Sequence, residues 1–344
     1  MKTNPGRFFE DYTVGQTIIH AVPRTLSGGE RALYHALYPA RHALYSSDAF
    51  AQACGLAASP MDDLAAFHVV FGKSVPDISL NAVANLGYAE GRFFQPVYPG
   101  DTLNSVSEVI GLKENSNGKT GIVYVRTRGF NQRDEVVLDF VRWVMVRKSD
   151  PNAPAPQTVL PELKPVLEAS DLTVPYGLTF EDYNADLAGE PHLWGDYEVG
   201  EIIDHVDGVT LEDTEHMMAT RLWQNTAKVH FDVTARPDGK RLIYGGHIIS
   251  MARALSFNGM ANAQMIAGIN AGAHANPAFA GDTVRAWTEV LDKAETSRDG
   301  VGAMRLRLVA TKDPVPGGHP LKDDAGKYLP HVLLDFDYWV LIPQ

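Results

Sequence analysis

Alternating apolar and polar residues mark the later part of each half of the chain. The runs Thr120-Gly121-Ile122-Val123-Tyr124-Val125-Arg126-Thr127 and Met304-Arg305-Leu306-Arg307-Leu308-Val309 have the period of two that is typical of half-buried strands. Asn117-Gly118, just before the first run, predicts a type I′ hairpin turn. These patterns predict antiparallel sheet in both halves.

Helical periodicity precedes the strands in each half. Between Gly28 and Leu44, apolar residues such as Leu33 and Leu37 recur at helical spacing. The run from Ile248 to Leu255 is apolar on most sides, as expected of a buried helix. We therefore expect an entry strand, helical segments and then several strands in each half, which is an α+β fold.

The chain also contains an internal repeat. Three pairs of segments recur in the same order: Asp11-Tyr12-Thr13-Val14-Gly15 with Asp196-Tyr197-Glu198-Val199-Gly200, Pro96-Val97-Tyr98-Pro99-Gly100-Asp101-Thr102 with Pro277-Ala278-Phe279-Ala280-Gly281-Asp282-Thr283, and Arg142-Trp143-Val144-Met145-Val146 with Tyr338-Trp339-Val340-Leu341-Ile342. An ordered series of matches indicates duplication of one unit.

The two copies are separated by a proline-rich segment. Six prolines lie between Asp150 and Pro175, and proline favours an extended connector over a helix or an inner strand. We predict a first repeat at 1–149, a linker at 150–184 and a second repeat at 185–344.

Charge and cysteine content limit the function. The formal net charge of −12 argues against a nucleic-acid binder, which needs an excess of Lys and Arg. Cys54 is the single cysteine, so no intrachain disulfide can form. The N-terminus has no apolar signal core, and no run is long and apolar enough to cross a bilayer. We therefore expect a cytoplasmic protein without membrane partners.

Three segments carry a resemblance to a known family. Phe94-Gln95-Pro96-Val97-Tyr98-Pro99-Gly100-Asp101-Thr102-Leu103 closely resembles a strand of MaoC-like hydratases. Phe67 to Tyr88 and Tyr244 to Ser250 resemble the mesaconyl-CoA hydratases, also called β-methylmalyl-CoA dehydratases, of the ethylmalonyl-CoA pathway. The resemblance implies a tandem (double) hotdog fold, with an antiparallel sheet wrapped around a central helix in each repeat. It also implies reversible hydration of mesaconyl-CoA, with a CoA thioester as the partner.

The MaoC-like pattern Asp-x-Asn-Pro-x-His implies catalytic residues in the second copy. His230 takes the histidine position, and Asn225 stands where the family has aspartate. Asparagine cannot exchange a proton near neutral pH, so Asn225 can only orient water or the imidazole. We expect His230, Asn225 and Gln224 to be the catalytic residues. A second carboxylate could complete the site, and Asp232 and Glu215 are the nearest in sequence.

The first copy lacks this constellation. Gapless alignment on the Tyr12 and Tyr197 positions places Ala40 opposite Asn225 and Tyr45 opposite His230. His42 is nearby but has no partner at the family spacing. We expect the first copy to be non-catalytic and to widen the pocket for the acyl group.

A glycine pair opens the apolar helix of the second copy. The unpaired backbone N–H groups of Gly246 and His247 would suit a developing thioester enolate, because a helix N-terminus carries the positive end of the dipole. A tight turn with close packing is the alternative. His247 aligns with His68 of the first copy, which favours a structural role for its imidazole.

The substrate of this family carries a free carboxylate, so an arginine partner is expected. Arg253, on the apolar helix, and Arg221, just before Gln224, are the candidates. The histidines show no metal-ligand spacing, so we expect no metal and no cofactor.

Two alternatives share this fold. A double-hotdog acyl-CoA thioesterase would direct water at the thioester carbonyl, and Asn225 would suit that role. A non-catalytic acyl-CoA-binding protein is the second. One tandem chain can mimic a dimer of single repeats, and further pairing into a homodimer stays open.

Overall fold

The computed structural model describes residues 2–344 and contains two successive units with the same order of elements. The first unit begins with an entry strand, continues through helices and ends in four strands. Its elements are η1 (Phe9–Asp11), β1 (Thr17–Thr25), α1 (Gly28–Leu37), α2 (Ala43–Ser46), α3 (Asp48–Ala53), α4 (Asp63–Ile78), β2 (Ala82–Phe93), β3 (Thr102–Glu114), β4 (Thr120–Phe130) and β5 (Val136–Arg147).

The second unit repeats this order after a connector. The connector contains η2 (Ala169–Asp171), and the second unit opens with α5 (Ala185–Ala188) and η3 (Trp194–Asp196), the counterpart of η1. It continues with β6 (Ile202–Thr210), α6 (Asp213–Leu222), η4 (Lys228–His230), η5 (Val233–Ala235), α7 (Gly245–Leu255), α8 (Phe257–Met260), β7 (Met265–His274), β8 (Thr283–Glu295), β9 (Val301–Thr311) and β10 (Val332–Pro343). The expected strands and the buried helix of the second copy are therefore confirmed.

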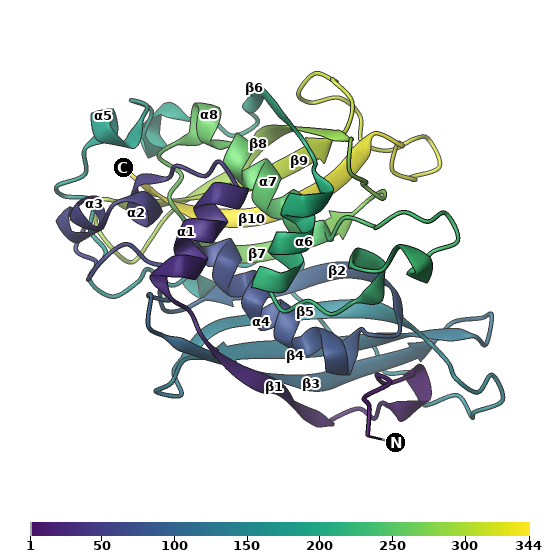
Figure 1. Cartoon of the computed structure of the whole chain (residues 1–344). Helices are drawn as coiled ribbons and strands as arrows, with labels where there is room; N and C mark the ends of the chain where they lie inside the picture. The colour runs from purple at the N-terminus through teal and green to yellow at the C-terminus, as the bar shows by residue number, and fades with distance from the viewer. Residues whose placement is uncertain (1) are drawn as a thin grey trace.

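All ten strands form one antiparallel sheet. Their order is β1-β3-β4-β5-β2-β7-β10-β9-β8-β6, so each unit contributes five neighbouring strands. The two units meet where β2 pairs with β7, through Gly91 with Ile269 and Arg92 with Gly268. Figure 1 shows α4 and α7 on the same face of this sheet, with α1 and α6 beside them.

The central helices are buried on nearly all sides. Fourteen residues of α4 and ten of α7 are buried, which explains why their sequences lack a polar stripe. Each helix starts after an extended residue, Asp62 for α4 and Tyr244 for α7. Aligning these starts places His68 opposite Ser250, and the two side chains are hydrogen-bonded across the pseudo-twofold axis at 2.9 Å. The alignment of His68 with His247 was therefore wrong.

The helix predicted between Gly28 and Leu44 is shorter than expected. α1 ends at Leu37, and Leu44 belongs to the separate helix α2. Tyr38 adopts an extended conformation because it precedes Pro39, whose ring disfavours a helical conformation in the residue before it.

The predicted hairpin at Asn117-Gly118 joins β3 to β4, but its turn type differs. Gly118 has a positive φ of 63°, whereas Asn117 is absent from the residues with positive φ. A type I′ turn needs positive φ at both central residues. The five-residue loop 115–119 is instead held by the Asn117 side chain, which accepts a hydrogen bond from the Lys119 amide.

Matching hydrogen bonds in the two units confirm the duplication. The Tyr12 hydroxyl donates to the carbonyl of Ile78 at 2.9 Å, and the Tyr197 hydroxyl donates to that of Gly259 at 3.0 Å. These tyrosines tie the start of each unit to the last residue of α4 and to α8, which directly follows α7.

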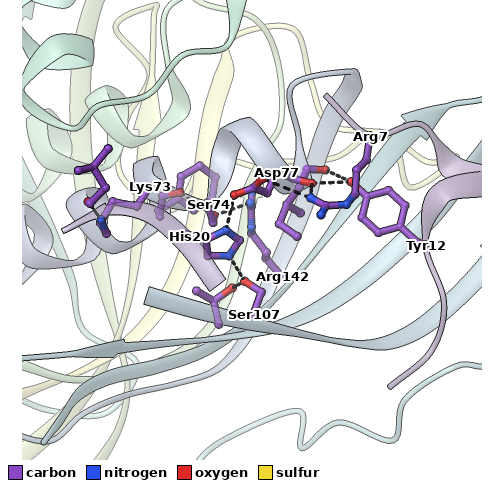
Figure 2. Close-up of polar contacts among 12 residues, drawn as sticks. Arg7, Tyr12, His20, Lys73, Ser74, Asp77, Ser107 and Arg142 are labelled. Carbon is purple, nitrogen blue, oxygen red and sulfur yellow. Dashed lines mark hydrogen bonds and ion pairs between the residues drawn. The ribbon is translucent and has the colours of Figure 1, made fainter. Parts of the chain in front are cut away.

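A second matching pair accounts for a buried Ser-His-Asp arrangement (Figure 2). His20 Nε2 lies 2.7 Å from the Ser107 hydroxyl, and His20 Nδ1 lies 2.9 Å from Asp77. In the second unit, His205 makes the equivalent contacts with Thr288 Oγ1 and a backbone carbonyl, both at 2.8 Å. Because the contact recurs with threonine and without a carboxylate, it is a structural link between the entry strand and the neighbouring strand.

The connector packs against the protein rather than standing free of it. Val159 forms a β-bridge with Leu112, and the side chain of Asn270 accepts a hydrogen bond from the Leu167 amide at 2.8 Å. Leu167 and Leu178 are buried in a hydrophobic cluster that includes residues of the second unit. Within residues 2–344, no helix combines the length and apolarity that a membrane span would need.

Gly72 on α4 allows the two units to approach closely. A Cβ at this position would lie 1.9 Å from the carbonyl oxygen of Trp223, in the segment that leads to Asn225. We predict that Gly72→Ala lowers the free energy of unfolding by at least about 1–3 kcal/mol, as overpacking does. Chemical denaturation measures this change. Gly28→Ala, where a Cβ meets nothing within 4 Å, is the matched control, and equal stability of the two variants would contradict the prediction.

Candidate active site

A cavity of about 290 Å³ lies between the two units. One wall comes from the second half of α4, from β2 and from β5, and the other from the segment around His230, the start of α7 and the end of β7. Its lining residues include Phe71, Val75, Ser79, Asn85, Tyr88, Arg142, Asn225, His230, Tyr244, Gly245, Ile248 and His274. The site therefore exists only where both units meet.

His230 presents one fixed ring nitrogen to this cavity. Its Nδ1 lies 2.7 Å from the carbonyl oxygen of Leu242, which can only accept a hydrogen bond, so Nδ1 carries the proton and Nε2 keeps its lone pair. Burial lowers the pKa of His230 to about 4. The imidazole is thus neutral at neutral pH and suited to act as a general base.

Asn225 lies on the same segment and is 1% exposed. Its Oδ1 accepts a hydrogen bond from the amide of Ala227 at 3.0 Å, so its NH₂ group is the part left for the cavity. An amide nitrogen can hold a water molecule or a carbonyl, but it cannot transfer a proton.

The other residues predicted near His230 do not line the cavity. Gln224 has a positive φ of 55°, and its backbone N–H donates to the carbonyl of Arg221, so it shapes the turn after α6. Asp232 points to solvent and caps η5 through the amide of Thr234 at 2.8 Å. Glu215, on α6, is also absent from the lining, and no Asp or Glu lines the cavity among residues 2–344. The expected second carboxylate is not found.

The start of α7 borders the cavity at Gly245. First-turn amides have no partner within a helix, so those of Gly245 and Gly246 carry its positive end. The amide of His247 is occupied, because it donates to the carbonyl of Tyr244 at 2.9 Å. The Gly246 amide, one of the two predicted to stabilise an enolate, is therefore still available. The Gly245 amide takes the place that was predicted for the His247 amide.

Neither arginine predicted for the substrate carboxylate lines the cavity. Arg253 is buried on the far side of α7, where its guanidinium donates to the carbonyls of Ala263 and Gln264 and contacts His42 Nε2 at 2.6 Å. Arg221 is exposed at the end of α6. The structure therefore does not bring either arginine to this cavity, because a helical arginine can point away from the site that its neighbours form.

Sequence reasoning missed Tyr244, His274 and Arg142. The Tyr244 ring lies 5.6 Å from that of His230 and 5.7 Å from that of Phe71, centroid to centroid, and its hydroxyl is buried without a partner among the described residues. Arg142 is fully buried on β5. One signal was available: Arg142 stands opposite Tyr338 in the repeated segments, so the copies differ in charge at a core position.

The corresponding place in the first unit is closed. Tyr45, opposite His230, donates its hydroxyl to Asp63 at 2.5 Å, and aligning the helix starts puts Asp63 opposite Gly245. The Asp63 carboxylate also accepts from the amide of Ile266 at 2.7 Å. The cavity left beside these groups is about 10 Å³, which is at most the space that one water molecule needs and far too small for an acyl group.

Known proteins match the chain over its whole length. The family model for mesaconyl-CoA hydratase matches residues 2–319. The sequence is 72% identical to mesaconyl-CoA hydratase of Cereibacter sphaeroides, with 100% of both chains covered. It is 60% identical to β-methylmalyl-CoA dehydratase of Chloroflexus aurantiacus, covering 100% of this chain and 99% of that protein.

Solved structures confirm the fold. A protein from Chloroflexus aurantiacus described as a MaoC domain dehydratase superimposes with a TM-score of 0.97 at 60% identity, covering 100% of this chain and 99% of that one. A Mycobacterium tuberculosis protein with a double hotdog fold has a TM-score of 0.73 at 24% identity, covering 98% of each chain, which supports the fold alone. The predicted tandem hotdog is confirmed, and the chain belongs to the mesaconyl-CoA hydratase family.

Proposed function

We propose that this chain catalyses the reversible addition of water to mesaconyl-CoA, giving β-methylmalyl-CoA, in the cavity between its two units. The relatives are named as a hydratase and a dehydratase of these CoA thioesters, so the chain is a hydro-lyase. The observation that carries the site assignment is His230, a neutral imidazole of fixed tautomer in a cavity that also receives the start of α7.

Each part of the reaction has a group to perform it. The amides of Gly245 and Gly246 hold the thioester oxygen as negative charge develops on it. The Asn225 NH₂ group orients the water, and His230 Nε2 takes its proton as the oxygen bonds to the β-carbon. The protonated imidazole then returns that proton to the α-carbon, so the atoms of one water molecule are added and His230 is regenerated.

The two units have different roles in this proposal. The second unit supplies His230, Asn225 and the helix start, whereas the first supplies the wall formed by α4, β2 and β5. The closed space beside Tyr45 and Asp63 explains why one unit performs the chemistry alone.

A thioesterase would need a group that directs water at the thioester carbonyl. The buried Ser107–His20–Asp77 arrangement cannot supply it, because Ser107 is fully buried and none of the three residues lines the cavity. The relatives likewise favour the hydro-lyase.

Incubation with mesaconyl-CoA separates the two reactions. We predict that absorbance from the conjugated thioester falls while a thiol reagent detects no free CoA. Release of thiol at the rate of the absorbance loss would instead establish a thioesterase. Binding without either change would indicate an acyl-CoA-binding protein.

Substitution of His230 tests the proposed base. We predict that His230→Gln lowers kcat for mesaconyl-CoA hydration by about 10²–10⁴-fold, the usual contribution of a positioned general base. The matched control is His205→Gln, which changes a buried structural histidine outside the cavity. An equal loss in both variants, at equal folded fraction, would argue against His230 as the base.

The pH dependence of hydration reports the protonation of His230. A base acts only when unprotonated, and burial holds the pKa of His230 at about 4, below the usual 6.5. We therefore predict that kcat/KM stays level from pH 7 down to about 5 and falls as the pH approaches 4. Assays started by a pH jump from neutral buffer avoid prior acid unfolding. A fall centred near pH 6.5 would contradict the assignment.

A further inference from the structure

Among residues 2–344, Arg142 is the one arginine in the cavity lining, and it is 0% exposed. It projects from β5 beneath α4, where its guanidinium carbon lies 4.1 Å from the centre of the Phe71 ring. Its NH2 group donates to the Ser74 hydroxyl at 2.7 Å, and its NH1 group contacts the Ser79 hydroxyl at 3.4 Å. Figure 2 shows Arg142 close to Ser74.

No carboxylate within residues 2–344 forms an ion pair with Arg142. Asp77, one turn beyond Ser74 on α4, is engaged with Arg7 at 3.2 Å and with His20 at 2.9 Å. The Nε–H of Arg142 has no partner within the described chain. Burying an unpaired charge is strongly unfavourable. Burial lowers the pKa of Arg142 to about 10, which still leaves the guanidinium charged at neutral pH.

Other unused polar groups line the same cavity. The Tyr244 hydroxyl and both polar atoms of the Asn85 amide are buried without partners in the described chain. Tyr88, by contrast, is already engaged through its hydroxyl with His274 Nε2 at 2.9 Å. A cavity lined by a guanidinium with a spare donor, a free hydroxyl and a free amide suits a carboxylate.

The positions of Arg142 and His230 on either side of Tyr244 also fit a substrate whose carboxylate is next to the reacting carbon. The Tyr244 ring contacts both ends of the site, since its centre lies 5.6 Å from that of His230 and 5.7 Å from that of Phe71, over which Arg142 lies. In mesaconyl-CoA the free carboxylate is bonded directly to the β-carbon, which receives the water. A carboxylate held at Arg142 therefore leaves the β-carbon on the His230 side of Tyr244.

We propose that Arg142, with Tyr244 and Asn85, binds the free carboxylate of the substrate and selects dicarboxylic enoyl thioesters over uncharged ones. This inference rests on the proposed function and names the group that determines its substrate class. Pairing the carboxylate with Arg142 also offsets the negative charge next to the carbon that the water oxygen attacks. Loss of Arg142 should therefore lower kcat as well as raise KM.

The wall of the closed site position, which the second unit supplies, supports the assignment by contrast. Tyr338 stands opposite Arg142, and aligning the helix starts places Arg253 opposite Phe71, so the arginine and the aromatic residue are exchanged between strand and helix. The NH1 and NH2 groups of Arg253 are used by two backbone carbonyls, His42 and Ser256. In Arg142, by contrast, NH1 and NH2 contact only serine hydroxyls, and Nε is buried without a partner among the described residues.

The test compares mesaconyl-CoA with tiglyl-CoA, in which a methyl group replaces the free carboxylate. We predict that Arg142→Gln lowers kcat/KM for mesaconyl-CoA by roughly 30- to 1,000-fold, as loss of one partner of a buried charge pair does. The kcat/KM for tiglyl-CoA should be unchanged or higher. Arg142→Lys should fall between the wild type and Arg142→Gln, since lysine keeps the charge but not the planar fork.

Two further variants guard against a folding defect. Tyr244→Phe removes only the unpartnered hydroxyl and should lower the mesaconyl-to-tiglyl ratio about tenfold with normal thermal stability. Arg253→Gln makes the same chemical change at the other buried arginine, which lies outside the cavity lining, and should leave the ratio unchanged. A wild-type ratio in both Arg142→Gln and Tyr244→Phe would overturn the inference.

Binding of saturated thioesters separates this inference from the proposed function. We predict that succinyl-CoA binds the wild type at least tenfold more tightly than butyryl-CoA and that Arg142→Gln abolishes the preference. A preference that survives in Arg142→Gln would overturn the carboxylate assignment even if hydration is confirmed. Failure of the wild type to hydrate mesaconyl-CoA would instead reject the proposed function, while the binding preference would still test Arg142.

Discussion

The pairing of β2 with β7 is the constraint on which the rest of the molecule depends. Two positions on these strands leave no room for a side chain. A Cβ on Gly91 would lie 2.8 Å from Ile269, and one on Gly272 would lie 2.7 Å from the Tyr88 ring. The same strands carry Tyr88 and His274, whose side chains are hydrogen-bonded at 2.9 Å within the cavity lining. Joining the two five-stranded halves of the sheet therefore also assembles the site, and neither unit alone could enclose it.

The duplication provides two equivalent positions for a site, and the side chains close one of them. In the first unit, a tyrosine and a carboxylate fill the space that His230 and Gly245 leave open in the second. The open cavity contains no carboxylate among residues 2–344, so its arginine has no internal partner and its histidine has no acidic neighbour. Such a cavity suits an anionic substrate and a neutral base, and both are what hydration of a dicarboxylic thioester requires.

The fold followed from the sequence because strand alternation and the repeated segments are local features. Errors arose where one residue overrides a pattern, as Pro39 does when it ends the helix predicted to reach Leu44. His230 and Asn225 were predicted from a motif and the glycine start of α7 from the properties of a helix N-terminus, and all three line the cavity or border it. Arg142 and Tyr244 were not found, because they come from segments that only the folded chain brings together. The difference between Arg142 and Tyr338 at equivalent positions of the two copies was the one sequence feature that could have indicated Arg142.

The central claim is that each chain has one working site, formed by the second unit against the wall of the first. The most direct test is a crystal structure with a non-reactive thioether analogue of mesaconyl-CoA, together with calorimetric stoichiometry. The account predicts one ligand per chain, with its carboxylate at Arg142 and its β-carbon facing His230 Nε2. Two ligands per chain, or an acyl group beside Tyr45 and Asp63, would contradict it.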